Sequence, residues 1–300
     1  MKTASIGLCL LILGSSRLVQ GASYWETVQA QNPSGYWRFS PSEISGTTVA
    51  PTTGSVSGTL INGVTAGAAG PQTSGFGVGN TALDLENTTK VGLSQAQYLN
   101  LGDNFDTTRT AFTFSAWINP ESWHSSGSTF AGTLLAKWGT GGTGNQFFLS
   151  LIDNPIGTES LLSYVDINTN KASTAVGSIE LGEWQHVALV FQGDDPSVAG
   201  NDGYLNLYLN GEQAASLPLS LAAYRDGTSQ IFIGAPNTGN YGFDGLIDEI
   251  AIWDGTALSG EQIQAQYLAA VPEPSTLIGM LSAAVTGAAL VLWRRRKVRS

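Results

Sequence analysis

The chain has 300 residues, of which 42% are hydrophobic and only 12% are charged, and 37 are glycine. This composition argues against a disordered chain or a helical bundle and favours short strands joined by tight turns. The formal net charge of −10 argues against a nucleic-acid partner, because phosphates select basic surfaces. The single cysteine, Cys9, excludes an internal disulfide and a cysteine-based zinc site.

The N-terminus has the pattern of a signal peptide. Lys2 provides a positive start, and an apolar run follows over residues 4–14. Small or tolerated residues at 19–21 predict cleavage by signal peptidase after Gly21, so the leader is expected to cover residues 1–21. Because Cys9 lies inside the leader, we expect the mature chain to contain no cysteine.

The region 22–270 is predicted to form one all-β domain. Apolar runs separated by Gly, Asn and Pro at short spacing are typical of a two-sheet antiparallel sandwich of the jelly-roll type. The runs that predict strands are 111–118, 146–152, 161–167, 184–191, 204–209, 212–217, 231–233 and 246–253. Asn210-Gly211 predicts a hairpin, because both turn positions need positive φ. One helix is expected after Ser259, its N-cap, with Gln262 as the capping-box partner.

Several short motifs follow one another along this region. They lie at 82–85, 112–120, 134–137, 184–188, 207–211, 245–250 and 257–263. Together with the opening segment 22–40, the series resembles the laminin-G-like, concanavalin A-like jelly-roll domains of bacterial secreted proteins. That resemblance implies two sheets packed face to face and the binding of glycans or proteins, often with Ca²⁺.

The C-terminal segment 271–300 has three parts. Pro272, Glu273 and Pro274 form a motif, an apolar stretch covers about 276–293, and a basic cluster closes the chain at 294–299. The stretch is long enough for a transmembrane helix, and basic residues mark the cytoplasmic side. The tail resembles the bacterial PEP-CTERM sorting signal. The resemblance implies export, tethering to the inner membrane through the helix, and removal of the tail by an exosortase. A permanent single-pass anchor is the alternative.

We find no catalytic constellation in the sequence. Asp248 and Glu249 come nearest to the carboxylate pair of a glycosidase, but neighbouring strand residues point to opposite faces. Without a bulge they cannot form such a pair, and Asp244, before the strand, is no better placed. The two histidines are His124 and His186, and no GxSxG or GxxxxGKS motif is present. We therefore predict that the protein is not an enzyme and that His186 has a structural role.

Calcium is the metal that the sequence favours, because its ligands are hard oxygens from carboxylates, amides and carbonyls. Asp103 and Asn104, in the loop 102–106, are the first candidates for a Ca²⁺ site. The loops 237–244 and 194–202 are alternatives. For each loop, ordinary acidic residues that form Asx-turns are a competing explanation.

Three aromatic residues lie in glycine-rich or polar loop contexts where a sugar could stack on a ring. They are Trp123, Trp138 and Tyr241, the predicted ligand-binding residues. The tryptophans expected in the core are Trp37, Trp117, Trp184 and Trp253.

The sequence thus predicts an exported binding module at the cell surface or outside the cell, which recognises carbohydrate or another matrix polymer with Ca²⁺ as the candidate cofactor. A structural or adhesive matrix protein that binds protein partners is the first alternative, favoured by a flat sheet face without aromatics or a groove. A glycoside hydrolase or lyase is a further alternative, which needs two carboxylates about 5–10 Å apart in a cleft. Since basic residues gather at the two ends of the chain, the domain between them is more acidic than the average.

Overall fold

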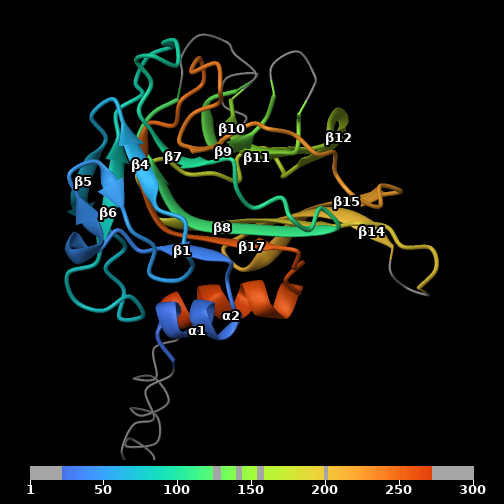
Figure 1. Cartoon of the computed structure of the whole chain (residues 1–300). Helices are drawn as coiled ribbons and strands as arrows, with labels where there is room; N and C mark the ends of the chain where they lie inside the picture. The colour runs from blue at the N-terminus through green and yellow to red at the C-terminus, as the bar shows by residue number, and fades with distance from the viewer. Residues whose placement is uncertain (1–21, 124–129, 140–143, 154–158, 199–201, 272–300) are drawn as a thin grey trace, which may run out of the picture.

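The computed structural model describes residues 22–123, 130–139, 144–153, 159–198 and 202–271. These residues form two antiparallel sheets packed face to face (Figure 1). The all-β sandwich predicted from the sequence is confirmed. Two helices, α1 (Tyr24–Ala30) and α2 (Gly260–Ala270), lie on one outer face of the sandwich, and a 3-10 turn, η1 (Pro41–Glu43), precedes β2.

The two predicted targeting segments lie outside the described residues. These are the signal peptide at 1–21 and the tail from 272 on, with the motif at Pro272, Glu273 and Pro274 and the transmembrane helix expected at about 276–293. Within the described ranges, no helix combines the length and the apolar character that a bilayer crossing requires.

Sheet A lies next to the helices (Figure 1). Across the sheet its strands are β15 (Glu212–Leu219), β14 (Gly203–Leu209), β13 (Gln185–Gln192), β8 (Ala111–Pro120), β17 (Gly245–Asp254), β6 (Thr81–Leu85) and β5 (Thr65–Ala69), and β1 (Gly35–Trp37) also pairs with β17. The turn between β14 and β15 has φ values of 50° at Asn210 and 80° at Gly211, which confirms the predicted hairpin.

Sheet B packs on the other side of the core. Across the sheet its strands are β12 (Ile167–Ser173), β11 (Ser160–Val165), β10 (Phe147–Ile152), β9 (Gly132–Lys137), β16 (Ile231–Ile233), β7 (Tyr98–Gly102), β4 (Gly58–Ile61), β3 (Thr48–Val49) and β2 (Ile44–Ser45). Strands distant in the sequence thus become neighbours, as β9 and β16 do.

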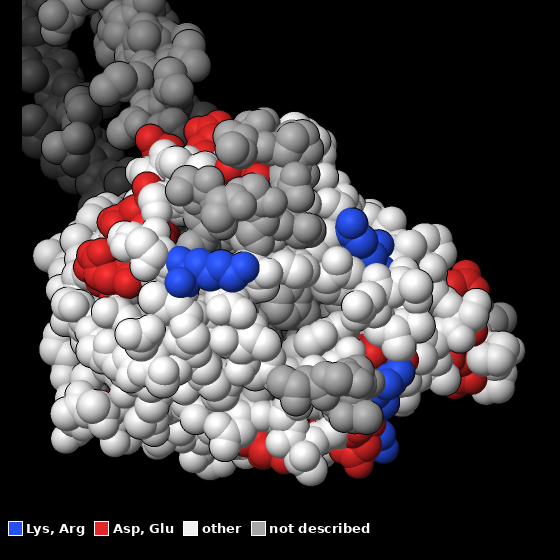
Figure 2. Space-filling view, turned by 90° about the horizontal axis from the view of Figure 1, so that it is seen from above, with Lys and Arg blue, Asp and Glu red and all other residues white. Residues whose placement is uncertain are grey.

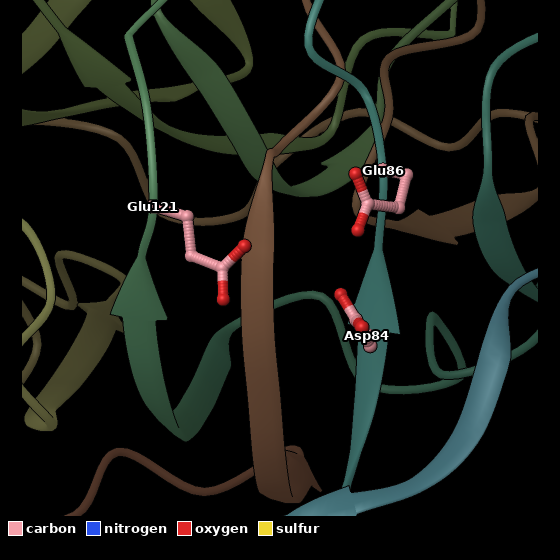
Figure 3. Close-up of side chains that lie close together, drawn as sticks. All are labelled: Asp84, Glu86 and Glu121. Atoms are coloured by element: carbon pink, nitrogen blue, oxygen red, sulfur yellow. The ribbon is translucent and has the colours of Figure 1, made fainter.

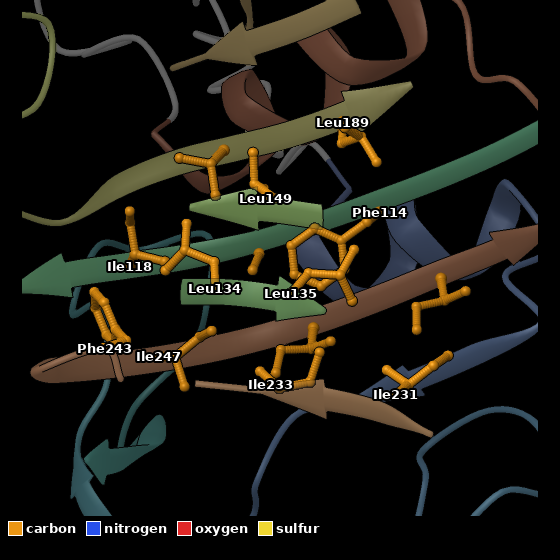
Figure 4. Close-up of a cluster of buried hydrophobic side chains, with 14 of the residues drawn as sticks. Phe114, Ile118, Leu134, Leu135, Leu149, Leu189, Ile231, Ile233, Phe243 and Ile247 are labelled. Carbon is orange, nitrogen blue, oxygen red and sulfur yellow. The ribbon is translucent and has the colours of Figure 1, made fainter. Parts of the chain in front are cut away.

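The main core lies between the sheets, because alternate residues of each strand point toward the opposite sheet. Figure 4 shows Phe114, Ile118 and Leu189 of sheet A in this layer with Leu135 and Leu149 of sheet B. Each of these side chains is exposed by 1% or less. The same alternation decides which neighbouring residues reach the outer faces.

A second apolar layer covers the outer face of sheet A. Tyr24 of α1 and Ile263 of α2 are fully buried in a cluster with Trp117 and Trp253 of the sheet. This layer joins the first described helix to the last, because α1 and α2 also contact each other.

The two helices differ in how well the sequence predicts them. α2 begins as expected: the Gln262 N–H donates to the Ser259 hydroxyl at 3.3 Å, and the Ser259 N–H donates to the Gln262 side chain at 2.9 Å. The prediction of a single helix is wrong, since α1 is a second one. Its start uses the same device, because the Ser23 N–H donates to the Glu26 carboxylate at 2.8 Å.

Candidate functional site

The outer face of sheet B carries a pocket of about 360 Å³ with an aromatic lining. Its lining residues are Phe130, Trp138, Gly139, Phe148, Tyr164, Asn168, Pro236, Asn237, Thr238 and Tyr241. We call it the aromatic pocket. None of these lining residues is charged. Figure 2 views the molecule from this side, where a few charged side chains are scattered among large uncharged areas.

Strand alternation builds the floor of the aromatic pocket. Phe147 points into the core, so its neighbour Phe148 points outward, opposite Tyr164 of β11 and Ala136 of β9. The small Ala136 leaves space beside the rings. Trp138 follows β9 directly, and its ring centroid lies 6.0 Å from that of Phe148 and 5.8 Å from that of Tyr164.

One wall of the pocket comes from the segment 234–244, which connects β16 to β17. The Thr133 N–H donates to the Tyr241 carbonyl at 2.8 Å and so attaches this segment to β9. The side-chain amide of Asn237 donates to the Trp138 carbonyl. These two hydrogen bonds hold the segment 234–244 against β9 and against Trp138, which follows β9.

The Tyr241 ring is held from two sides. The centroid of the Phe130 ring lies 5.3 Å away, and the Lys90 ammonium lies 4.7 Å from the Tyr241 ring centroid, a cation–π contact. The Lys90 ammonium also donates to the Tyr241 hydroxyl at 3.5 Å. At the rim, the side chains of Asn168 and Thr238 are exposed. The pocket therefore combines ring faces with neutral hydrogen-bonding groups.

Two of the three predicted ligand-binding residues, Trp138 and Tyr241, lie together in the aromatic pocket. Trp123 does not line it and packs instead against the core between the sheets. Phe148 and Tyr164 also line the pocket and are not among the predicted residues, although their places in the strand runs 146–152 and 161–167 were the signal for both.

The loop predicted to hold calcium lies beside a lysine of β9. The buried Lys137 ammonium lies 2.5 Å from the Asp103 carboxylate and 3.3 Å from that of Asp106, and it donates to the Ser229 carbonyl at 2.8 Å. The Asn104 side-chain amide donates to the Leu101 carbonyl of β7 at 2.7 Å. A lysine of the chain thus neutralises these carboxylates, and calcium at Asp103 and Asn104 stays a prediction.

The other residues singled out in the sequence have local partners. The Asp195 carboxylate accepts from the N–H and the hydroxyl of Ser197, at 3.0 Å and 2.6 Å, which is the Asx-turn alternative for its loop. His186 is fully buried, with Nε2 3.2 Å from the Gln266 side-chain oxygen, and burial lowers its pKa to about 4. His124 lies outside the described residues.

The expectation that Asp248 and Glu249 point to opposite faces is wrong, because β17 has a bulge there. Asp248 pairs with Trp117 and Ala251 with Ser115, so β17 carries one extra residue, and Glu249 has a φ of 54°. Both carboxyl side chains therefore reach the layer under the helices.

The two bulge carboxyls have separate partners in that layer. Asp248 accepts from Asn80 at 2.6 Å, and Glu249 accepts from the Tyr36 hydroxyl and from Arg38 at 3.3 Å. Burial raises the pKa of Glu249 to about 7, and burial together with the Glu249 charge raises that of Asp248. Since both side chains are fully buried, they present no surface to a substrate.

Comparison with known families gave two matches. A laminin G-type family model, described as the concanavalin A-like lectin/glucanases superfamily, matches residues 93–264. A model of the PEP-CTERM protein-sorting motif matches residues 270–297. Comparison with curated proteins gave no significant match.

Solved structures share the fold at low sequence identity. Domain 4 of AbnA, a GH43 extracellular arabinanase from Geobacillus stearothermophilus, is 19% identical with a TM-score of 0.53, over 78% of this chain and 98% of that domain. The binding domain of Paraclostridial Mosquitocidal Protein 1 is 15% identical (TM-score 0.54), over 79% of this chain and 52% of its own. The botulinum neurotoxin serotype G binding domain is 13% identical (TM-score 0.53), over 79% and 50%. The chain thus spans about half the length of the two toxin domains.

Proposed function

This chain belongs to the concanavalin A-like lectin/glucanases superfamily, and we propose that it is a non-catalytic binding module whose aromatic pocket holds a glycan of the cell envelope or the surrounding matrix. The PEP-CTERM motif indicates an exported protein that is sorted to the cell envelope in an exosortase-dependent way. We include in the proposal a transient tether through residues 276–293 before the tail is removed near Pro272, Glu273 and Pro274.

The observation that carries the proposal is the composition of the aromatic pocket. Sugars present apolar C–H faces, which pack on aromatic rings, and hydroxyl groups, which need neutral donors and acceptors. Trp138 and Tyr241 offer half-buried rings, while Asn168, Asn237 and Thr238 offer amide and hydroxyl groups beside them. A volume of about 360 Å³ lies at the small end of ligand pockets, which suits one or a few sugar units.

Two further observations support a neutral glycan. The described lining has no charged side chain that would select an ionic ligand. Domain 4 of AbnA, which shares the fold, was solved in complex with arabinotriose. A protein-binding matrix component would be favoured by a flat face, whereas the outer face of sheet B has a pocket.

The test is glycan binding by the purified protein, first on an array and then by titration calorimetry. We expect Trp138→Ala and Tyr241→Ala to weaken binding by about tenfold or more, because aromatic anchors in a pocket carry much of the binding energy. Trp25→Ala is the matched control, since it removes a half-buried indole ring on the helix side of the molecule.

Two outcomes would contradict the proposal in different ways. Unchanged affinity of both pocket variants would place the glycan elsewhere on the protein. Absence of binding to any glycan would rule out the ligand class, and release of a shortened sugar during the titration would reveal an enzyme.

A further inference from the structure

Four carboxylates gather at one end of sheet A, on its outer face. Asp84 lies in β6, Glu86 follows this strand, Glu121 follows β8, and Asp244 precedes β17. The carboxylate oxygens of Asp84, Glu86 and Glu121 all lie within 4.8 Å of one another. Figure 3 shows these three side chains converging on the space above β17 from strands on either side of it. We call the four residues the acidic cluster.

The sheet register explains why residues so distant in the sequence meet here. Leu246 of β17 pairs with Asp84 of β6 on one side and with Asn119 of β8 on the other. Leu83, Ile118 and Ile247, each next to one of these three residues in its strand, belong to the core between the sheets. Asp84 and Asn119 therefore point outward. Glu86 and Glu121 follow two positions later and share that face.

Backbone contacts bring Asp244 into the same place. The Glu121 N–H donates to the Asp244 carbonyl at 3.0 Å. Gly245, the next residue, has a φ of 134°, and a Cβ there would lie 2.3 Å from the Asn119 carbonyl oxygen. Glycine at this position therefore permits the close approach of β17 to β8 that sets Asp244 beside Glu121.

Several oxygens at the acidic cluster are buried without a donor. Asp244 is only 4% exposed; its Oδ2 accepts from the Ser122 hydroxyl, but its Oδ1 has no hydrogen-bond partner. Asp84 Oδ1 and Asn119 Oδ1 are buried acceptors of the same kind. A buried acceptor without a partner is costly, and native proteins satisfy nearly all of them. Three such oxygens at the acidic cluster leave lone pairs available to a cation.

The charges of the acidic cluster act on one another, and no ion pair within the described part of the chain compensates them. Among the described residues, no lysine or arginine forms an ion pair with any of the four carboxylates. Burial and the charge of Asp244 raise the pKa of Asp84. Burial and the charges of Asp84, Asp244 and Glu86 raise that of Glu121. Gly245 pairs with Leu85 on one side and with Pro120 on the other, so Asp244, one position earlier, lies between Glu86 and Glu121.

We propose that the acidic cluster binds a divalent cation of the Ca²⁺ class, with Asp84, Glu86, Glu121 and Asp244 as its carboxylate ligands. The donors are hard oxygens that come from three strands, and the Asn119 amide oxygen is available as a fifth. Ca²⁺ accepts numerous oxygens in a flexible geometry, whereas Mg²⁺ demands a near-ideal octahedron and keeps several waters. This site is separate from the loop of Asp103 and Asn104, and it does not depend on the proposed glycan function.

The first test compares the protein stripped with EDTA and the same protein titrated with CaCl₂. We expect heat of binding in calorimetry and a higher unfolding temperature with calcium, because a ligand that binds only the folded state stabilises it. Binding should be tighter at higher pH, since the carboxylates must lose their protons. Absence of both the heat and the temperature shift would overturn the proposal.

The second test uses Glu86→Gln and Glu121→Gln, because both side chains are exposed and surface substitutions usually change stability little. Each should weaken calcium affinity by about tenfold or more, as even outer-shell partners of metals do when changed. In EDTA the same variants should unfold at the same or a higher temperature than the wild type, because a repelling charge is gone. A merely structural role would lower the unfolding temperature in both conditions and would contradict the proposal.

Two control variants locate the cation. Glu212→Gln removes an exposed carboxylate of β15, an edge strand that pairs with none of β6, β8 and β17, and should leave the calcium response unchanged. Asp103→Asn should also keep the response to calcium, since Lys137 is the partner of that carboxylate. Loss of the response in Asp103→Asn, with full binding in Glu86→Gln and Glu121→Gln, would move the cation to the other loop and overturn the assignment.

Discussion

The two outer faces of the sandwich use aromatic residues for opposite purposes. On sheet A, Trp117 and Trp253 are covered by α1 and α2 and are exposed by 2% or less. On sheet B, no helix of the described chain covers the rings, and Trp138 and Tyr241 line an accessible pocket. The same residue type thus stabilises the fold on one face and forms a candidate binding surface on the other. What differs is the element that lies above the ring.

The largest effect expected on the covered face is that of Trp253→Ala. Trp253 is 1% exposed, and its indole N–H donates to the Gln31 carbonyl at 2.9 Å. Truncation should lower the free energy of unfolding by about 3–5 kcal/mol, measured by urea denaturation. Trp138→Ala on the open face should lower the free energy of unfolding by well under half of this amount. Equal losses for the two variants would remove the distinction between the faces.

His186 gives the covered face a dependence on acid. Its pKa is about 4 in the folded protein, against 6.5 for the free side chain, so the unfolded state takes up the proton first as the pH falls. The free energy of unfolding that depends on this group is fully present above pH 6.5. It falls by about 3 kcal/mol as the pH is lowered from 6.5 through 4. Denaturation at a series of pH values should show a shallower acid loss in His186→Gln than in the wild type. Identical slopes would contradict the buried neutral histidine.

Glu249 acts in the opposite direction at higher pH. Its folded pKa of about 7 lies above the value of 4.5 for the free group, so the unfolded state loses the proton first. Stability from this group is present below pH 4.5 and is lost as the pH rises through 7. We expect Glu249→Gln to gain stability relative to the wild type between pH 5 and pH 8, because glutamine has no proton to lose. Arg38 and Tyr36 favour the charged form and already limit the rise of the Glu249 pKa to about 7. A pH-independent difference would show that the carboxyl is ionised throughout.

The smallest effect concerns the edge of the open face. Lys90→Met removes the ammonium beside the Tyr241 ring and keeps most of the side-chain length. A cation–π contact at an exposed site contributes about 0.5–1 kcal/mol, so its loss should lower the free energy of unfolding by no more than this amount and should change glycan affinity by only a few-fold. Calorimetry on the variant would check this. A loss as large as that of Trp138→Ala would assign Lys90 a direct contact with the ligand.

The sequence predicts those features that depend on local pattern. Alternating apolar runs predict strands such as β8 and β13, and the Ser259–Gln262 capping box predicts α2. The bulge at Asp248 and Glu249 escapes prediction because it depends on how many residues the opposite strand supplies. The helix α1 also has a local signal, the Ser23–Glu26 capping box, but a helix of seven residues depends for its stability on burial of Tyr24 against sheet A.

The candidate sites, too, are predicted from the sequence only where local pattern determines them. Trp138 and Tyr241 were selected by loop context, but only the pairing of β9 with the segment 234–244 brings them together. Asp84 and Glu86 already share one face by alternation. Their meeting with Glu121 follows from the order of β6, β17 and β8 in the sheet, which local pattern does not encode.

The stacking order of helices, sheet A and sheet B also determines an orientation. The described chain enters the domain at α1 and leaves it after α2, and both helices lie on the face opposite the aromatic pocket (Figure 1). A segment that continues from Ala270 to a membrane would keep sheet A on the membrane side. The domain would then stand with its attachment at one pole and its ligand entrance at the other, directed toward the surroundings of the cell.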